Sequence, residues 1–410
     1  MDAPVGLSPA KPLDMREGAL WAYRLLLNRE PESAAAISTH ADLAKTANAL
    51  RSAFVDSTEF ATLIDRAGTP VRPPSFPVDI VEGVRWAYRL LFFREPTDDE
   101  VREAAARSRT IQDVRRNFIL SRDFELAATS RMRLLLSFEV LNAFAPFQVE
   151  APDQGAFRDF IGSTTRVEYL PSYHAWQAGT VERHPNQSHL HGLGEWIGTL
   201  RSVLEADGSL VAVELGAGWG PWLIGAAHAA RKRGIANIRL YGVEGSGDHY
   251  GYMVDHFRRN GFNPDEHHLY HAVVGAEDGV ARFPRHVDNS DYGSNAVFEG
   301  DLDGARAMVE VRCIALNTLL ADEERVDLIH VDIQGHEEVV LRAAIETLNR
   351  NTRRIVVGTH GRRIEEDLLE LFSQAGWIIE HEQACTFRQL RDNRVVLGMD
   401  GEQVWRNPRI

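Results

Sequence analysis

The chain has 410 residues, of which 44% are hydrophobic and 25% charged, and its formal net charge is −14. This length supplies two or three globular domains, and the acidic balance argues against nucleic acid as a partner. No apolar run approaches the roughly 18 residues that span a bilayer, and residues 1–15 lack the apolar centre of a secretory signal. Cys313 and Cys385 are predicted to be buried free thiols. We therefore expect a cytoplasmic protein without a transmembrane segment.

The N-terminal third contains a tandem repeat. The segment Glu17–Pro31, EGALWAYRLLLNREP, recurs 65 residues later as Glu82–Pro96, EGVRWAYRLLFFREP. Each copy is typical of a helix, a loop that ends in proline, and further helix. We therefore expect one helical repeat over residues 1–70 and a second over residues 78–130.

Each repeat carries a tryptophan, Trp21 or Trp86, on the apolar face of its first helix. We interpret both as core residues, with a sugar-binding platform as the alternative. On its Y-R-x-L-L-x-R-E-P segment and its closing S-x-E/D-F segment, the unit resembles the DUF4214 family over residues 15–128. That resemblance implies no activity. The repeats are expected to serve a partner protein or a homo-oligomer.

Residues 131–205 are predicted to form a helical linker and then a lid or pre-core segment. The stretch 155–192 is irregular and rich in aromatic and histidine residues, among them His174, His184, His189 and His191. Their spacing matches no standard metal-ligand set. A lid over a cofactor site is therefore our interpretation, and a metal site is the alternative.

Residues 206–410 alternate between strand and helix patterns. Such alternation predicts an α/β fold with a doubly wound, mainly parallel, seven-stranded Rossmann-like sheet. The seven expected strands span residues 211–215, 238–243, 268–274, 326–332, 353–359, 376–382 and 394–399. Ligands bind at the carboxyl ends of such strands, so the residues that follow each strand carry the functional prediction.

The first strand ends in three alternating glycines, Gly216, Gly218 and Gly220. A dinucleotide-binding G-x-G-x-x-G turn would need a further glycine where Pro221 or Leu223 stands. The G-x-G-x-G pattern instead resembles motif I of class I S-adenosylmethionine (SAM) methyltransferases.

The order of later segments resembles the FkbM family of SAM-dependent O-methyltransferases over residues 205–400. The matching segments are Ala272–Gly275, Asn317–Leu320 and the motif D-x-Q-G-x-E-x-x-x-L at Asp332–Leu341. The chain departs from the family pattern at Gly218, Gly245 and Leu320. The resemblance implies a class I methyltransferase fold and SAM as cofactor.

The cofactor site implied by this resemblance has nine residues. The glycines would admit the methionine part of SAM, Glu214 would receive its amino group, and Glu244 would accept hydrogen bonds from both ribose hydroxyls. The full set is Glu214, Gly216, Ala217, Gly218, Gly220, Glu244, Gly245, Ala272 and Val273.

Four candidate catalytic residues follow the fourth and fifth expected strands: Asp332, His336, Glu337 and His360. Two mechanisms remain open. Either Asp332 or His360 acts as a general base, or Mg²⁺ or Mn²⁺ held by Asp332, Glu337 and His360 acidifies the acceptor hydroxyl. His330 is interpreted as a packed strand residue.

The polar loop 286–295 contains the candidate substrate-binding residues Asp291, Tyr292 and Asn295. Such a loop suits a polyhydroxylated ligand, and it equally suits an ordinary surface turn. We expect O-methylation of a sugar or glycan hydroxyl, in glycan biosynthesis. The alternatives are O-methylation of a secondary metabolite, and a SAM fold kept only as a scaffold or interaction module.

Overall fold

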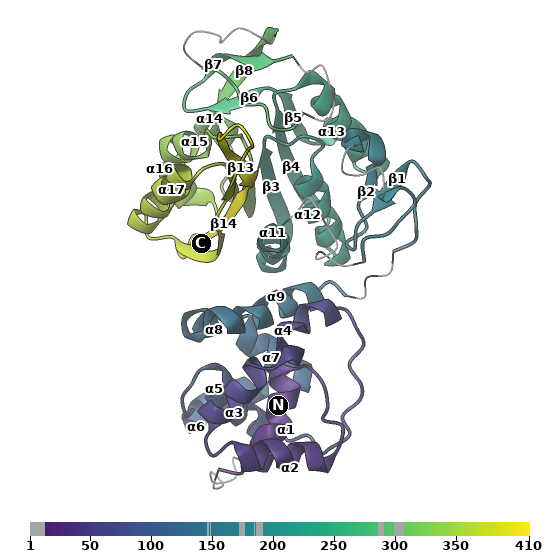
Figure 1. Ribbon diagram of the computed structural model, residues 1–410, viewed down its shortest axis with the longest axis vertical. Coiled ribbons are helices and arrows are strands. Elements are labelled where there is room, and N and C mark those ends of the chain that lie inside the picture. The colour runs from purple at the N-terminus through teal and green to yellow at the C-terminus, as the bar shows by residue number, and fades with distance from the viewer. Residues whose placement is uncertain are drawn as a thin grey trace. The chain divides into compact units, whose positions relative to one another are not determined.

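The computed structural model describes residues 13–145, 147, 149–171, 177–183, 185, 192–285, 291–298 and 307–410. It divides into two compact units, Met1–Pro146 and Phe147–Ile410 (Figure 1). The predicted linker 131–205 is thus shared between them, because its first helix belongs to the first unit. The four histidines of the predicted lid and residues 286–290 of the polar loop lie outside the described residues.

The first unit is helical, and its helices repeat. Helices α1 (Met15–Leu26), α2 (Ala34–Leu43), α3 (Ala47–Val55) and α4 (Thr58–Ala61) correspond to α5 (Ile80–Leu91), α6 (Asp98–Ala106), α7 (Ile111–Ile119) and α8 (Arg122–Ala127). Helix α9 (Arg133–Asn142) follows them. Corresponding helices start at corresponding caps: Thr46 and Thr110 begin α3 and α7, and each side chain accepts a hydrogen bond from a backbone N–H of its helix.

The tryptophans of the two repeats pack reciprocally between α1 and α5. A Cβ atom added to Gly18 would lie 2.3 Å from the Trp86 ring, and one added to Gly83 would lie 2.3 Å from the Trp21 ring. Both tryptophans are only 1% exposed. They are core residues, as predicted, and the alternative of a sugar-binding platform is wrong.

The second unit contains the predicted seven-stranded sheet, in the order β11-β14-β10-β9-β3-β4-β5. Its strands are β3 (Ser209–Leu215), β4 (Asn237–Glu244), β5 (His268–His271), β9 (Leu328–Val331), β10 (Arg354–Thr359), β11 (Ile378–Gln383) and β14 (Gly401–Arg406). The five strands from β10 to β5 are parallel, and β14 runs antiparallel to both of its neighbours. The α/β class and the mainly parallel sheet are therefore confirmed.

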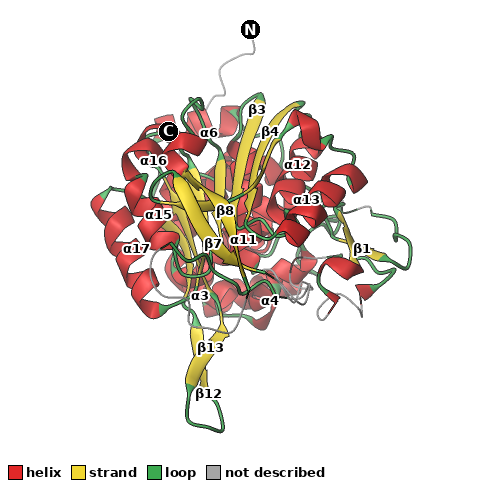
Figure 2. Cartoon of the chain, turned by 90° about the horizontal axis from the view of Figure 1, so that it is seen from above, coloured by secondary structure: helices red, strands yellow, loops and turns green. Residues whose placement is uncertain are grey.

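Two strand predictions need correction. The segment expected at 394–399 forms β13 (Val395–Met399), which pairs with β12 (Thr386–Gln389) in a hairpin that projects from the unit (Figure 2). Strand β14 takes the seventh place in the sheet instead. The segment expected at 268–274 is split into β5 and β6 (Val273–Gly275), and β6 joins a separate sheet with β7 (Gly279–Pro284) and β8 (Met308–Ala315).

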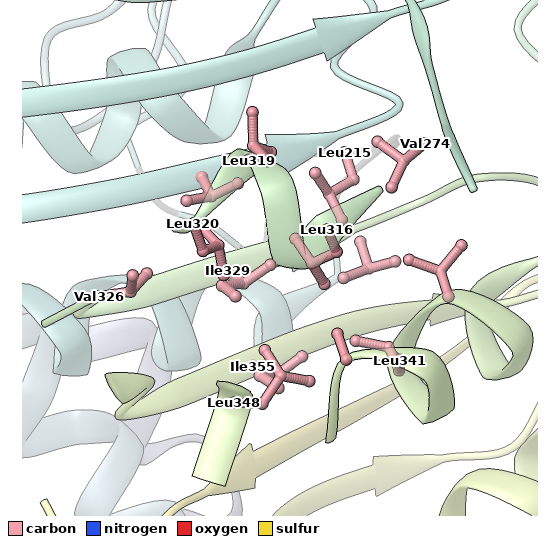
Figure 3. Packing of buried hydrophobic residues seen from close by; sticks show 14 of the residues in the cluster. Leu215, Val274, Leu316, Leu319, Leu320, Val326, Ile329, Leu341, Leu348 and Ile355 are labelled. Atoms are coloured by element: carbon pink, nitrogen blue, oxygen red, sulfur yellow. The ribbon is translucent and has the colours of Figure 1, made fainter. Parts of the chain in front are cut away.

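Helices cover both faces of the sheet. One face packs Leu215, Ile329 and Ile355 against α14 (Leu316–Leu319), α15 (Glu337–Ala343), α16 (Ile345–Asn351) and α17 (Arg362–Gln374) (Figure 3). The other face contacts α11 (Leu193–Glu205), α12 (Pro221–Lys232) and α13 (Gly247–Arg259). The sheet is therefore doubly wound, as predicted.

Residues of the predicted pre-core segment pack on α13. The hairpin β1 (Ala156–Arg158) and β2 (Thr164–Arg166) precedes the core, and the Asn260 side chain accepts a hydrogen bond from the Thr164 N–H and donates one to its carbonyl oxygen, at 2.7 and 3.0 Å. Cys313 and Cys385 are buried and free. Within the described ranges, no helix has the length and apolar character that a membrane crossing requires.

Candidate functional site

The first feature of the site is the glycine turn after β3. Strand β3 lies between β4 and β9, where the order of the sheet reverses direction, and ligands bind at such a switch point. Gly216 has φ +75°, and a Cβ atom there would lie 1.8 Å from the carbonyl oxygen of Asp332. Gly218 has φ +55°, and its Cβ atom would lie 3.0 Å from the Tyr292 ring. Only glycine fits this turn, and its backbone stays open to a ligand.

Glu244 holds the glycine turn at the end of β4. Its two carboxylate oxygens accept hydrogen bonds from the N–H groups of Gly218 and Ser246, each at 2.7 Å. The residue is 6% exposed, and this burial raises the pKa of the carboxyl group to about 7. Each oxygen retains a second lone pair, so the carboxylate can still accept hydrogen bonds from ligand hydroxyls.

The side chain of Glu214 contacts the start of α12. Its carboxylate accepts a hydrogen bond from the N–H of Leu223 in the first turn of α12, at 3.1 Å. Burial raises its pKa well above the usual range. Glu214, Ala217 and Gly220 do not line the pocket described next. Gly220 instead caps α12 with φ +73°. These three predicted cofactor residues therefore belong to the turn and the start of α12, and they do not contact the pocket.

A pocket lies over the carboxyl ends of β3, β4 and β9. Its volume is about 670 Å³ when the open solvent at its entrance is included. The predicted residues that line it are Gly216, Gly218, Glu244, Gly245, Ala272, Val273, Asp291, Tyr292, Asn295, Asp332 and His336. The lining residues that sequence reasoning missed are Val243, His249, Val274, Phe283, Ser294, Ala296, Phe298, Ile333 and Gln334.

Tyr292 closes one wall of this pocket. Its hydroxyl donates a hydrogen bond to the carbonyl oxygen of Tyr169 at 2.6 Å. Its ring stacks on His249, with centroids 3.9 Å apart and an interplanar angle of 2°. Nothing in the local sequence of His249 indicates this contact. Its place two residues into the helix after β4 is the one available signal, since that helix begins at the pocket.

Asp332, Glu337 and His360 come together as predicted. His360 Nδ1 lies 2.8 Å from Glu337 Oε1, and His360 Nε2 lies 3.3 Å from Asp332 Oδ1. Burial opposes the charge on His360, but the two carboxylates outweigh it and raise the pKa of the imidazole to about 11. Asp400, which sequence reasoning missed, lies 3.9 Å from the same Nε2 atom.

The motif D-x-Q-G-x-E forms a tight turn between β9 and α15. The buried Glu337 carboxylate accepts hydrogen bonds from the N–H groups of Ile333 and Gly335, at 3.3 and 3.0 Å. Gln334 has φ +54° and donates a hydrogen bond to Asp332 at 2.9 Å. Gly335 has φ +108°, which favours glycine. The turn thus places Asp332 at the pocket and Glu337 beneath it.

Two predicted histidines have contrasting environments. His336 lines the pocket, and its buried Nδ1 has no hydrogen-bond partner among the described residues. Burial lowers the pKa of His336. His330 does not line the pocket, since its ring stacks on Trp222 and its Nε2 lies 3.0 Å from Glu195 Oε1. It is a packed strand residue, as predicted.

Comparison with known proteins agrees with this geometry. Residues 227–388 match the model of the methyltransferase FkbM domain. A protein of Jannaschia sp. (strain CCS1), whose name assigns it provisionally to the methyltransferases, is 29% identical over 262 residues, which is 62% of this chain and 93% of that protein.

Solved structures of methyltransferases are also similar to this chain. The FkbM methyltransferase of Methylobacillus flagellatus KT is 13% identical, with a TM-score of 0.32 over 68% of this chain and 55% of that one. The precorrin-6y C5,15-methyltransferase of Geobacter metallireducens GS-15 is 13% identical, with a TM-score of 0.31 over 52% of this chain and 86% of that one. Similarities of this size carry no argument about activity.

Proposed function

Because the chain is a methyltransferase with an FkbM domain at residues 227–388, we propose that it transfers a methyl group from SAM to a hydroxyl of a sugar or glycan. One observation carries the proposal: a single pocket is lined both by the glycine turn with Glu244, here called the first wall, and by a set of polar side chains, here called the second wall. Gly216, Gly218 and Glu244 belong to the first wall. Asp291, Asn295 and other polar residues form the second.

The first wall fits SAM, which supplies an activated methyl group on a sulfonium when it is bound. Gly216 and Gly218 line the pocket, and a Cβ atom at either position would crowd Asp332 or Tyr292. Glu244 would accept hydrogen bonds from the ribose hydroxyls. Ala272 and Val273, both buried, would flank the adenine ring.

The second wall fits an acceptor with several hydroxyl groups. The residues Asp291, Ser294, Asn295 and Gln334 are among those that line the pocket. Carboxylate and amide groups of this kind pair with hydroxyl donors and acceptors at the same time.

Proton removal is assigned to His336. As the acceptor oxygen forms its bond to the methyl carbon, the bond from that carbon to the sulfonium sulfur breaks with its electron pair passing to sulfur, and the acceptor must lose its hydroxyl proton. His336 lines the pocket, and burial lowers its pKa and so keeps its imidazole neutral. His360 is the weaker choice, since two carboxylates hold it as a cation. Asp332 faces the pocket and orients the acceptor.

The proposal is tested first by calorimetric titration with S-adenosylhomocysteine. We expect micromolar binding by the wild type and its loss in Glu244→Ala. Sugars and nucleotide sugars are then incubated with methyl-labelled SAM, and the product is mapped by NMR for an O-methyl ether. Absence of binding in the wild type would remove the SAM site, and a methyl group found on nitrogen or carbon would remove the O-methylation.

A further inference from the structure

Three adjacent strand ends meet beside the pocket. Strand β10 lies between β9 and β14, and Thr359 pairs with Gly401 across the β10–β14 ladder. His360 directly follows Thr359, and Asp400 directly precedes Gly401, so these two residues face each other beyond the ladder. Asp332 directly follows the end of β9. Strand pairing alone therefore brings Asp332, His360 and Asp400 to one point.

The Nε2 atom of His360 points into this cluster without a hydrogen bond. The side chain is 7% exposed, and Nε2 is a buried atom with no hydrogen-bond partner among the described residues. It lies 3.3 Å from Asp332 Oδ1 and 3.9 Å from Asp400 Oδ1. Each of these two carboxylate oxygens is therefore spaced from Nε2 as a neighbouring ligand of one ion with bonds of about 2.1 Å would be.

Glu337 orients the imidazole from its other side. Its Oε1 lies 2.8 Å from His360 Nδ1, and its remaining hydrogen bonds go to backbone N–H groups of the turn that precedes α15. A carboxylate on one histidine nitrogen fixes the ring and directs the opposite nitrogen at a metal, which is a common arrangement in metal sites. We assign Glu337 the orienting role, although its carboxylate also lies close enough to Asp332 and His360 to be counted among candidate ligands.

The charges of the cluster are unbalanced. Asp332, Glu337 and Asp400 supply three carboxylates, and within the described part of the chain their one ion-pair partner is His360. Such a concentration of negative charge attracts cations. The Asp400 side chain is 60% exposed, which leaves a route from solvent.

We propose that Asp332, His360 and Asp400 bind one divalent cation, Mn²⁺ or Mg²⁺, at the acceptor end of the cofactor pocket. The ion would displace the proton that His360 otherwise carries, and two carboxylates and one neutral imidazole leave coordination positions open for acceptor oxygens and water. The inference deepens the proposed function and rests on it only for the acceptor. A cation bound there would lower the pKa of the acceptor hydroxyl, so that the O–H bond could break with its electron pair staying on oxygen and its proton passing to His336.

The test is titration of the full-length protein with Mn²⁺ alone, followed by calorimetry and by the electron paramagnetic resonance signal of free Mn²⁺. We expect one ion per chain in the wild type, and binding weaker by about tenfold or more in Asp400→Asn and His360→Gln. Asp392→Asn is the matched control, because Asp392 lies in the β12–β13 hairpin and pairs with Arg394. It should bind Mn²⁺ like the wild type.

Asp400→Asn is the decisive variant, since its exposed side chain can be changed without disturbing the core. It should bind S-adenosylhomocysteine with wild-type affinity while losing Mn²⁺. Absence of stoichiometric Mn²⁺ binding in the wild type, or equal binding in wild type and Asp400→Asn, would overturn the cation site. If S-adenosylhomocysteine still binds in that case, the methyltransferase proposal stands without the cation.

Discussion

Gly216 lies directly against the backbone of Asp332: a Cβ atom on Gly216 would fall 1.8 Å from the Asp332 carbonyl oxygen. The N–H of Asp332 donates a hydrogen bond to the carbonyl oxygen of Leu215 at 2.9 Å. The glycine turn after β3 and the end of β9 at Asp332 are thus in contact through main-chain atoms. A change in one displaces the other.

Replacement of Gly216 by alanine is therefore expected to abolish binding of S-adenosylhomocysteine. The Cβ atom meets a backbone oxygen, which cannot move aside as a flexible side chain does, and φ of +75° adds strain. Gly208→Ala is the matched control, since Gly208 has φ +69° and nothing within 4 Å of its Cβ position. It should cost about 1–2 kcal/mol of stability and keep binding. Calorimetry and thermal unfolding check both variants, and equal binding by the two would contradict the contact.

The affinity for S-adenosylhomocysteine should depend on pH through Glu244. Burial raises the pKa of Glu244 to about 7, so the free protein holds this group neutral below pH 7 and ionised above it. If the ribose hydroxyls bind the carboxylate, affinity falls roughly tenfold from pH 8 to pH 6. Glu244→Gln should bind more weakly at pH 8 and should lose the Glu244 part of the pH dependence. An identical pH profile in the two proteins would show that Glu244 does not titrate in the bound site.

Replacement of His336, the proposed general base, should reduce turnover without changing cofactor affinity. His336→Ala is expected to lower kcat by about 10²–10⁴-fold and to leave the affinity for S-adenosylhomocysteine unchanged. His381→Gln is the control, because His381 lies 2.8 Å from Glu402 and does not line the pocket. Single-turnover methyl transfer and calorimetry measure the two effects. Full activity in His336→Ala would move proton removal to another group.

The first unit offers an independent prediction. Trp86→Ala empties the space between α1 and α5 and should cost about 3–5 kcal/mol. Gly18→Ala should also destabilise the unit, because its Cβ atom would lie 2.3 Å from the Trp86 ring. In the double variant the clash is gone, so the two costs should not add. Denaturant unfolding followed by tryptophan fluorescence measures all three. If the two losses in the free energy of unfolding were strictly additive in the double variant, Trp86 would not pack directly on Gly18.

Local patterns predicted much of the site. Gly216, Gly218, Glu244 and Asp332 each follow a strand whose apolar pattern is clear, and parallel strands bring their carboxyl ends to one edge. The role of Glu214 was not predictable in the same way. Glu214 also lies near the end of a strand, but its carboxylate accepts a hydrogen bond from the backbone N–H of Leu223. That contact depends on the conformation at the start of the next helix.

Strand β14 was missed for a different reason. Its sequence, GEQVWR, contains two polar residues that are buried in the sheet. Glu402 lies 2.8 Å from His381, and Gln403 accepts a hydrogen bond from Trp405 Nε1 at 3.0 Å. Partners of this kind make a polar strand stable, but sequence periodicity does not reveal them. Asp400 was missed with the strand, because its position is defined by the register of β14.

The reciprocal packing of Trp21 on Gly83 and of Trp86 on Gly18 has a consequence for how the first unit can change. Each indole occupies the space that the other repeat leaves by lacking a side chain. A repeat cut off by itself would present a bare tryptophan and an empty notch to water. The duplicated unit therefore resembles a homodimer fused into one chain, and an enlargement at either glycine must be answered by a smaller ring in the opposite copy.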